Sequence, residues 1–308
     1  MKKVFIDGSA GTTGLHIVQR LGERKDLLLL TLPEELRKDP QARKDCINQA
    51  DIVFLCLPDD AAREAAAMVE NEKTAVIDTS TAHRVQDGWV YGFPELKGQR
   101  TLIQKGLRIA NPGCHASGFI ALAAPLTAAG LLPRDAQLSC FSLTGYSGGG
   151  KKMIAQYESP DRDTLLDAPR QYGLSQAHKH LPEMAKYAGL SNAPAFCPIV
   201  APYYAGMEVT LPLFPEKLGV KLSDIQEAYR SYYQDGVVFF APSADEGGFL
   251  SAGAFAGRDD MQITVTGNEE RALAIARFDN LGKGACGAAI QNMNILIGAV
   301  ETAGLVLQ

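Results

Sequence analysis

The sequence lacks any long apolar run, which argues against a membrane-spanning protein. Among its 308 residues there is no stretch of about 18 apolar residues, the length that a transmembrane helix needs. The richest stretch, residues 119–132, is interrupted by Pro125, Thr127 and Gly130. The apolar stretch that begins at Val4 is too short for a signal peptide. We therefore expect a cytoplasmic protein.

An excess of positive charge is also missing. Lys and Arg total 30 residues and Asp and Glu total 35, so the formal net charge is −5. A mildly acidic chain attracts polyanions poorly, and we expect no nucleic-acid or membrane partner. Hydrophobic residues make up 46% and charged residues 21%, which is typical of a globular protein. The length suggests about two domains.

The six cysteines form no CxxC pair. Because no Cys or His ligands cluster at metal-binding spacing, we expect no metal site. In a chain of this length we expect reduced thiols, one of which could act in catalysis.

The first 112 or so residues alternate short apolar runs with helix-like stretches. Strands are predicted at 4–6, 27–31, 51–57, 74–78 and 107–110, and helices at 13–23 and 59–70. Nearly continuous apolar strands separated by helices are typical of a parallel sheet covered on both faces. The pattern predicts a doubly wound α/β domain.

The rest of the chain has a different pattern. Strands are predicted at 137–146, 195–200, 207–213, 237–240, 249–256, 261–266 and 272–278, several without a helix between them. This predicts an α+β domain with a mixed or largely antiparallel sheet. Residues 285–306 predict one long helix, which could return to pack on the first domain.

A glycine-rich turn, GSAGTTG at residues 8–14, joins the first strand to the first helix. Glycines let the backbone approach a pyrophosphate, and a helix N-terminus offers free N–H groups and positive potential. The turn therefore indicates a dinucleotide site, with a plain tight turn as the alternative. Arg37 and Lys38, downstream of the second strand, favour a 2′-phosphate and hence NADP(H).

Cys114 stands in the motif NPGCHAS, ahead of a helix-like stretch that reaches about residue 129. A helix N-terminus favours a thiolate, which can attack an acyl carbon and form a thioester. The alternative is a buried inert cysteine. The Asn-Pro-Gly turn favours the nucleophile, and the apolar settings of the other five cysteines indicate packing.

Three further motifs could carry chemistry. HKHLPE at 178–183 holds two histidines, which can exchange protons near neutral pH, or which form a plain surface pair. TGYSGGGKK at 144–152 could bind an anion through backbone N–H groups and lysines, or be a flexible loop. DTSTAHR at 78–84 carries Arg84, which suits a phosphate or carboxylate, or is simply solvated.

Together these stretches resemble the N-acetyl-γ-glutamyl-phosphate reductase family in its shorter form, type 2. The pieces that match keep the family's order along the whole chain: GSAGTTG (8–14), LCLPDDAA (55–62), DTSTAHR (78–84), YGFPEL (91–96), ANPGCHAS (110–117), TGYSGGGK (144–151), HKHLPEM (178–184) and NLGKGACGAAIQNMN (280–294). NPGC is shared with aspartate-semialdehyde dehydrogenases, whereas HKHLPE and the last piece are more specific. The sequence differs from longer members in the Thr-Ala-His before Arg84.

The resemblance implies a glyceraldehyde-3-phosphate-dehydrogenase-like α/β architecture. An NADP-binding Rossmann-type dinucleotide-binding domain would comprise residues 1–113 and 285–308. Residues 114–284 would form an α+β domain for catalysis, substrate binding and oligomerisation. The implied reaction is the NADPH-dependent reductive dephosphorylation of N-acetyl-L-glutamyl 5-phosphate to N-acetyl-L-glutamate 5-semialdehyde, in arginine biosynthesis. The enzyme would be a homo-oligomer, either a dimer or a tetramer.

The resemblance also assigns roles to residues. Cys114 would be the nucleophile, and His180 the acid and base, with His178 as the alternative. NADP(H) would contact Gly8, Ser9, Gly11, Thr12, Thr13, Gly14, Pro58, Ser80 and Asn292. The phosphate and carboxylate of the acyl-phosphate substrate would contact Arg84, Ser117, Tyr146, Lys151 and Glu183.

Three other functions stay open at this point. A sister enzyme could act on an aminoadipyl phosphate, because one methylene is worth only about 1–3 kcal/mol of discrimination. An aspartyl-phosphate reductase is a second possibility, and the HKHLPE motif argues against it. A non-catalytic NADP-sensing protein is the third, and it would need neither Cys114 nor the histidine pair.

Overall fold

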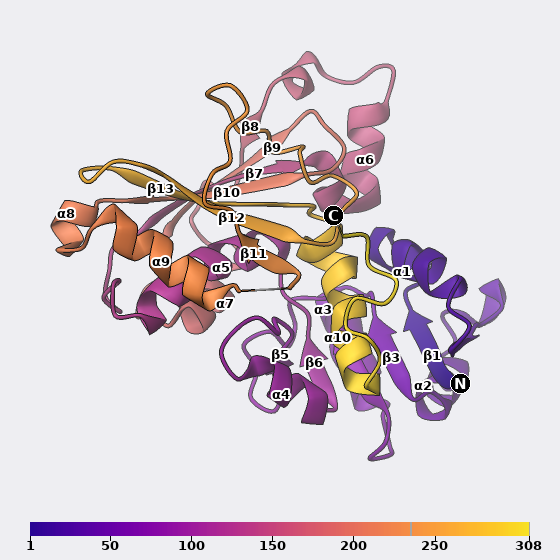
Figure 1. Ribbon diagram of the computed structural model, residues 1–308. Coiled ribbons are helices and arrows are strands. Elements are labelled where there is room, and N and C mark those ends of the chain that lie inside the picture. The colour runs from indigo at the N-terminus through magenta and orange to yellow at the C-terminus, as the bar shows by residue number, and fades with distance from the viewer. Residues whose placement is uncertain (235, 308) are drawn as a thin grey trace. The chain divides into compact units, whose positions relative to one another are not determined.

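The chain folds into two compact units. The computed structural model describes residues 1–234 and 236–307. The first unit comprises Met1–Pro112 and Ala285–Leu305. The second comprises Gly113–Gly284 and the last residues from Val306 onward (Figure 1).

The first unit is built on a six-stranded parallel sheet. The strand order is β2-β1-β3-β4-β6-β5, and every pairing is parallel. The strands are β1 (Lys2–Asp7), β2 (Leu27–Leu30), β3 (Ile52–Leu55), β4 (Ala75–Asp78), β5 (Val90–Tyr91) and β6 (Arg108–Ala110). The helical segments are α1 (Thr12–Gly22), η1 (Glu34–Leu36), α2 (Pro40–Gln49), α3 (Asp59–Ala67), α4 (Gln99–Lys105) and α10 (Gly287–Ile297).

Successive side chains of this sheet enter two separate cores. Val4 and Ile6 point to one face and join apolar residues of α1 and α10. Phe5, between them, points to the opposite face and joins residues of α2 and α3. Because successive strand residues face opposite sides, apolar strands of this kind need helices on both faces. This is the doubly wound α/β architecture that the apolar pattern predicted, and that prediction is confirmed.

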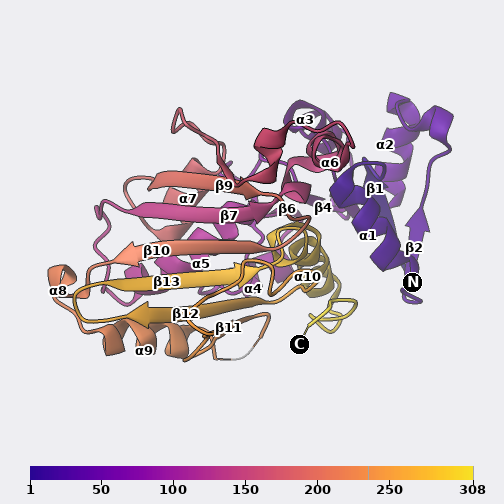
Figure 2. The ribbon, with the colours of Figure 1, turned by 90° about the horizontal axis from the view of Figure 1, so that it is seen from above.

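The second unit is built on a seven-stranded mixed sheet of order β11-β12-β13-β10-β7-β9-β8. Figure 2 shows β9, β7, β10, β13 and β12 side by side. The strands are β7 (Ser139–Gly145), β8 (Arg170–Gln171), β9 (Ala195–Ala201), β10 (Met207–Leu213), β11 (Val238–Phe240), β12 (Met261–Gly267) and β13 (Ala272–Phe278). The helical segments are α5 (Cys114–Ala128), η2 (Tyr146–Gly149), α6 (Gly150–Glu158), η3 (Thr164–Asp167), α7 (Leu181–Ala188), α8 (Pro215–Leu218), α9 (Leu222–Tyr232) and η4 (Gly282–Cys286), the last running into α10.

The centre of the second unit is α5. This helix packs on β10 and β13 and lies beside α7 and α9 (Figure 1). All its residues from His115 to Leu126 are buried. A helix that is apolar all round needs neighbours on every side, and the sheet and the two helices supply them.

Two predicted elements are wrong. Residues 249–256 form no strand, because their backbone makes short-range bonds instead, from Ala254 N–H to the carbonyl oxygen of Ser251 and from Ala256 N–H to that of Gly253. The single helix predicted over 285–306 is shorter, since α10 ends at Gly298, whose φ of 68° is left-handed. Glycine adopts that conformation without steric cost, so it closes the helix.

The sequence pattern predicts helices at 13–23 and 59–70 and after Cys114. Most of the other observed helices have no predicted counterpart.

Within the described residues, no helix combines the length and the apolarity that crossing a membrane would require.

Candidate active site

Cys114 is the first residue of α5. The turn Asn111-Pro112-Gly113 follows β6, and Gly113 caps the helix with an extended backbone. Peptide N–H groups at a helix start have no partner within the helix and carry positive potential. The thiol is partly exposed and forms no disulfide with another described cysteine. Gly284 makes room for it, because a Cβ at that glycine would lie 2.9 Å from the Cβ of Cys114.

Three histidines gather beside the start of α5. The ring centroid of His115 lies 5.7 Å from that of His180 and 5.9 Å from that of His178, and the last two rings are 4.7 Å apart. His178 is partly exposed, whereas His180 is buried. The structure thus brings both histidines of HKHLPE next to the residue that follows Cys114.

His115 was not selected from the sequence. Its Nδ1 lies 2.6 Å from Ser142 Oγ and its Nε2 lies 2.6 Å from the hydroxyl of Tyr172. Burial, assisted by His178, lowers the pKa of His115 to about 3, and burial raises the pKa of Tyr172. A protonated Tyr172 can donate to Nε2, which leaves Nδ1–H to donate to Ser142. His115 is therefore neutral near pH 7, and its position next to Cys114 in NPGCHAS was the signal that could have identified it.

Glu183 connects the two active-site motifs. It lies in the first turn of α7, it is 1% exposed, and its carboxylate accepts a hydrogen bond of 3.2 Å from Gly113 N–H. His180 is the residue before α7, and its N–H donates to Nδ1 of His178. The short spacing of HKHLPE therefore sets both histidines at the start of one helix and its glutamate against the start of the other.

The other predicted substrate residues of the second unit lie in three different elements, α5, η2 and α6. The Ser117 hydroxyl is fully buried, one turn into α5, and finds no hydrogen-bond partner among the described residues. Tyr146 stacks on Tyr157 with ring centroids 4.7 Å apart, and its hydroxyl donates to Glu158. Lys151 is exposed in the first turn of α6.

The glycine-rich turn of the first unit has no room for side chains at its ends. Gly8 has a φ of 85°, and a Cβ there would lie 2.3 Å from the carbonyl oxygen of Cys56. A Cβ at Gly14 would lie 2.4 Å from the carbonyl oxygen of Gly8. Helix α1 begins at Thr12 and has no side-chain cap. No capping side chain therefore accepts a hydrogen bond from the first N–H groups of the helix. Ser9 and Thr13 complete this turn, where the Thr12 hydroxyl is buried and unbonded within the described chain.

Asn292, in the middle of α10, is buried beside Asn111. Its Nδ2 donates to the Gly92 carbonyl oxygen over 2.9 Å and to Asn111 Oδ1 over 3.1 Å. Its Oδ1 is buried, and no described residue donates to it. Gly92 has to be a glycine, because a Cβ there would come within 2.4 Å of Asn292 Nδ2.

The remaining predicted residues of the first unit follow β3 and β4. Pro58 precedes α3, and Ser80 donates through its hydroxyl to Asp78 over 2.8 Å. Arg84 is buried and donates to the carbonyl oxygens of Asn111 and Thr79. Its guanidinium thus ties the turn after β4 to the turn that precedes Cys114.

The Thr-Ala-His departure also has a structural explanation. His83 Nδ1 lies 2.6 Å from Asp78 Oδ2, and the ring stacks on Trp89 at 3.9 Å between centroids. The imidazole therefore fixes the carboxylate that holds Ser80. Sequence reasoning did not select this residue, although it is a histidine inside a motif already of interest.

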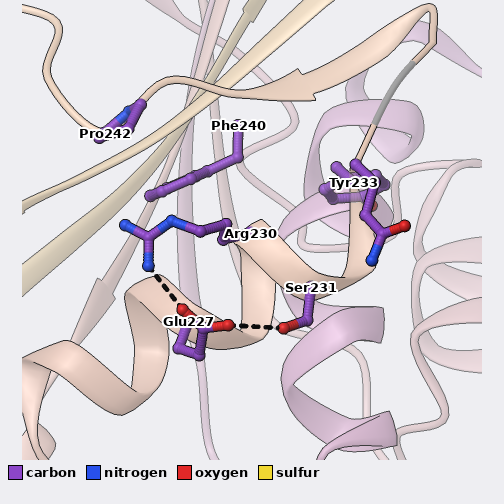
Figure 3. Close-up of a pocket in the computed structure, with 7 residues that line it drawn as sticks. Glu227, Arg230, Ser231, Tyr233, Phe240 and Pro242 are labelled. Carbon is purple, nitrogen blue, oxygen red and sulfur yellow. Dashed lines mark hydrogen bonds and ion pairs between the residues drawn. The ribbon is translucent and has the colours of Figure 1, made fainter.

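A pocket elsewhere in the second unit contains none of the predicted site residues. It lies between α9 and β11 and is lined by Glu227, Arg230, Ser231, Tyr233, Gln234, Phe240 and Pro242. Figure 3 shows that Glu227 is bonded to both Arg230 and Ser231. Its two charged groups thus pair with each other, and neither a cysteine nor a histidine lines the pocket. Nor does any group of three or more metal-binding side chains occur in the described part of the chain.

Comparison with known proteins finds a family match in each of the two units. Residues 30–104 match the family described as semialdehyde dehydrogenase, NAD binding domain, and residues 114–280 match semialdehyde dehydrogenase, dimerisation domain. Two relatives named N-acetyl-gamma-glutamyl-phosphate reductase 2 come from Nostoc sp. and Pseudomonas putida. They are 43% and 45% identical, over 98% of this chain and 99% and 98% of their own lengths.

Solved structures share the fold at much lower identity. Aspartate semialdehyde dehydrogenase II from Vibrio cholerae superposes with a TM-score of 0.73 at 16% identity, covering 97% of this chain and 98% of that one. The aspartate semialdehyde dehydrogenase with NADP from Candida albicans has a TM-score of 0.68 at 14% identity, covering 97% and 99%. The fold is thus that of the semialdehyde dehydrogenases, and by sequence the chain belongs to their N-acetyl-gamma-glutamyl-phosphate reductase family.

Proposed function

We propose that this protein reduces N-acetyl-L-glutamyl 5-phosphate to N-acetyl-L-glutamate 5-semialdehyde with NADPH, in arginine biosynthesis. The observation that carries the proposal is a partly exposed thiol at the start of a buried helix, beside three histidines. The name shared by relatives at 43–46% identity supports the choice of substrate. A non-catalytic NADP sensor would need no such arrangement.

Cys114 forms the covalent intermediate. Its thiolate attacks the acyl carbon, the bond from that carbon to the phosphate oxygen breaks, and phosphate leaves with the electron pair, giving a thioester. After reduction, the thiohemiacetal collapses to the aldehyde and returns the thiolate. The helix N-terminus stabilises the anionic sulfur at both ends of this sequence.

His180 acts as the acid and base in this proposal, with His178 as the alternative. It accepts the thiol proton, donates a proton to the carbonyl oxygen during reduction, and recovers it when the thiohemiacetal collapses. Glu183 holds the Gly113 N–H at the start of α5 and so positions Cys114. Its burial favours this positioning role over direct contact with substrate.

The residues of the first unit fit NADP(H). The tight backbone contacts at Gly8 and Gly14, which exclude side chains, support a turn of the kind that holds a pyrophosphate, which Ser9, Gly11, Thr12 and Thr13 would line. The buried, unbonded Oδ1 of Asn292 suits the carboxamide of a nicotinamide. Pro58 and Ser80 follow the carboxyl ends of the neighbouring parallel strands β3 and β4. Sheets of this kind bind nucleotides at the carboxyl ends of their strands. When bound, the cofactor supplies the hydride.

We propose that Ser117, Tyr146 and Lys151 contact the substrate. Ser117 offers a buried, unbonded hydroxyl one turn from Cys114, and Lys151 offers an exposed cation. Arg84 donates at least two hydrogen bonds to backbone carbonyl oxygens, which favours a positioning role for it at the Asn111 turn.

The reverse reaction tests this function and the acyl chain together. The purified protein, with phosphate and NADP⁺, is offered N-acetylglutamate semialdehyde, aspartate semialdehyde and the aminoadipate semialdehyde derivative, and NADPH formation is followed. We expect the highest kcat/KM with N-acetylglutamate semialdehyde. A preference for either of the other aldehydes identifies a sister enzyme, and no turnover with any of them identifies a sensor.

Removing the two charges after β2 should weaken the preference for NADPH. Arg37 and Lys38 are both exposed at the end of η1. Two charged contacts to a 2′-phosphate support a loss of roughly 10- to 100-fold in kcat/KM for NADPH in the R37Q/K38Q variant, with NADH unaffected. The control is K73Q, which removes an exposed lysine of the same unit. An unchanged NADPH/NADH ratio in the double variant contradicts the assignment.

We also propose a homo-oligomer formed through the open face of the second unit's sheet. Ser142 points to α5, so its neighbour Phe141 points away from it and is 42% exposed. Leu273, on the same face, is 40% exposed. Apolar side chains exposed on a sheet face mark a contact surface, and the strands fall within the match to a dimerisation domain.

Introducing a charge on this face should dissociate the oligomer. We expect F141K to have the 33.0 kDa mass of one chain by light scattering, whereas L165K, at a residue 68% exposed in η3, keeps the wild-type mass. An unchanged mass for F141K refutes this interface. That none of the six cysteines, all of which are described, forms a disulfide supports our proposal that the protein works in the reducing cytoplasm.

A further inference from the structure

Arg170 stands in the second unit with an unused donor. This residue begins β8, the edge strand of the sheet. Its Nη2 donates to the hydroxyl of Tyr157 over 3.3 Å, and its guanidinium lies 5.7 Å from the centre of the same ring. Its Nε–H is buried and finds no acceptor in the part of the chain that the structure describes. A buried donor of a charged group that has no acceptor destabilises the folded state, and a ligand group that supplies the acceptor would remove that cost.

The partners of Arg170 differ from those of its neighbour Arg162. Arg162 forms an ion pair with Asp167 at 2.6 Å and donates to the carbonyl oxygen of Tyr157. Arg170 has no carboxylate at ion-pair distance among the described residues. Both arginines therefore contact Tyr157, but only Arg170 keeps a cation available for an anion from outside the chain.

Arg170 shares one face of the sheet with the histidine cluster. Two residues along the chain, Tyr172 reaches Nε2 of His115, and residues two apart in extended backbone point to the same side, about 7 Å from each other. Arg170 pairs with Val200, which lies on the same side of β9 as Phe196. The Phe196 ring in turn packs against His115 and His178. One row of side chains thus leads from the histidines beside Cys114 to the guanidinium.

We propose that Arg170 binds the α-carboxylate of the acyl-phosphate substrate and so determines its specificity. This inference rests on the function proposed above. The reacting acyl group and the α-carboxylate lie at opposite ends of one short carbon chain, and a planar guanidinium matches a carboxylate with two parallel hydrogen bonds. Arg84 is a weaker candidate for this role, because carbonyl oxygens of its own chain already occupy its Nε and Nη2.

The test compares two aldehydes in the reverse reaction. N-acetylglutamate semialdehyde carries the carboxylate, and 4-acetamidobutanal is the same molecule without it. We expect the wild type to favour the first, and R170Q to lose on the order of 100-fold in kcat/KM with the first aldehyde while changing little with the second. R170K keeps the charge but not the planar fork, and should lie between them.

The controls separate structure from recognition. R162Q removes the neighbouring guanidinium and should leave the ratio of the two kcat/KM values unchanged. If R170Q and R170K lose activity equally with both aldehydes, or retain the wild-type ratio, Arg170 does not bind the carboxylate. If the wild type itself oxidises neither aldehyde, the proposed function fails and this inference fails with it.

Discussion

Replacing Cys114 with serine is expected to lower reductase activity by about 10⁴-fold or more. A serine hydroxyl has almost the same shape but does not ionise near neutral pH, so no acyl-enzyme forms. The fold and the NADPH site should survive, because the side chain begins a helix and is partly exposed. The measurement is NADPH oxidation with the acyl phosphate, together with NADPH binding by fluorescence titration.

The surroundings of other thiols explain why Cys114 is the one to test. Burial raises the pKa of Cys56 to about 12 and raises that of Cys140 as well. Burial, with Asp45 and Asp7, also raises the pKa of Cys46. C46S is the matched control and should keep full activity. Turnover by C114S within tenfold of the wild type contradicts the nucleophile assignment.

Replacing His180 with asparagine is expected to lower kcat by roughly 10²- to 10⁴-fold, the usual effect of losing an acid and base. H178N should lose less than about tenfold if His180 carries the proton, because His178 then serves mainly to accept the His180 N–H. The measurement is kcat against pH for both variants and the wild type. The reverse order of the two effects would give the role to His178.

The pH profile also separates these residues from His115. The pKa of His115 is lowered to about 3, so its ionisation falls well below the working range. Any inflection between pH 5 and 8 in the wild-type profile therefore arises from another group. If H180N keeps that inflection at the same pH and loses only rate, His180 is a positioning residue and not the acid and base.

Much of the fold could be predicted because local patterns decided it. Apolar residues at successive positions, 4–6 in β1 and 52–55 in β3, indicated strands buried on both faces, and these positions are all buried. The same reasoning failed at 249–256, where an apolar run with glycines at 247, 248 and 253 makes turns. The composition of such a segment predicts a buried or extended strand. Whether the backbone forms a strand or turns depends on its hydrogen-bond partners.

The sequence by itself determined the α/β class, the helix that begins at Cys114, and the short motif that carries both histidines. These depend on residues a few positions apart, where spacing and backbone preference are enough. The tertiary structure alone decided that His115 is neutral, that Glu183 holds the N–H of Gly113, and that Arg170 faces the histidine cluster through Tyr172. Each of these joins residues 27 to 70 positions apart or depends on burial, and neither sequence distance nor composition measures those.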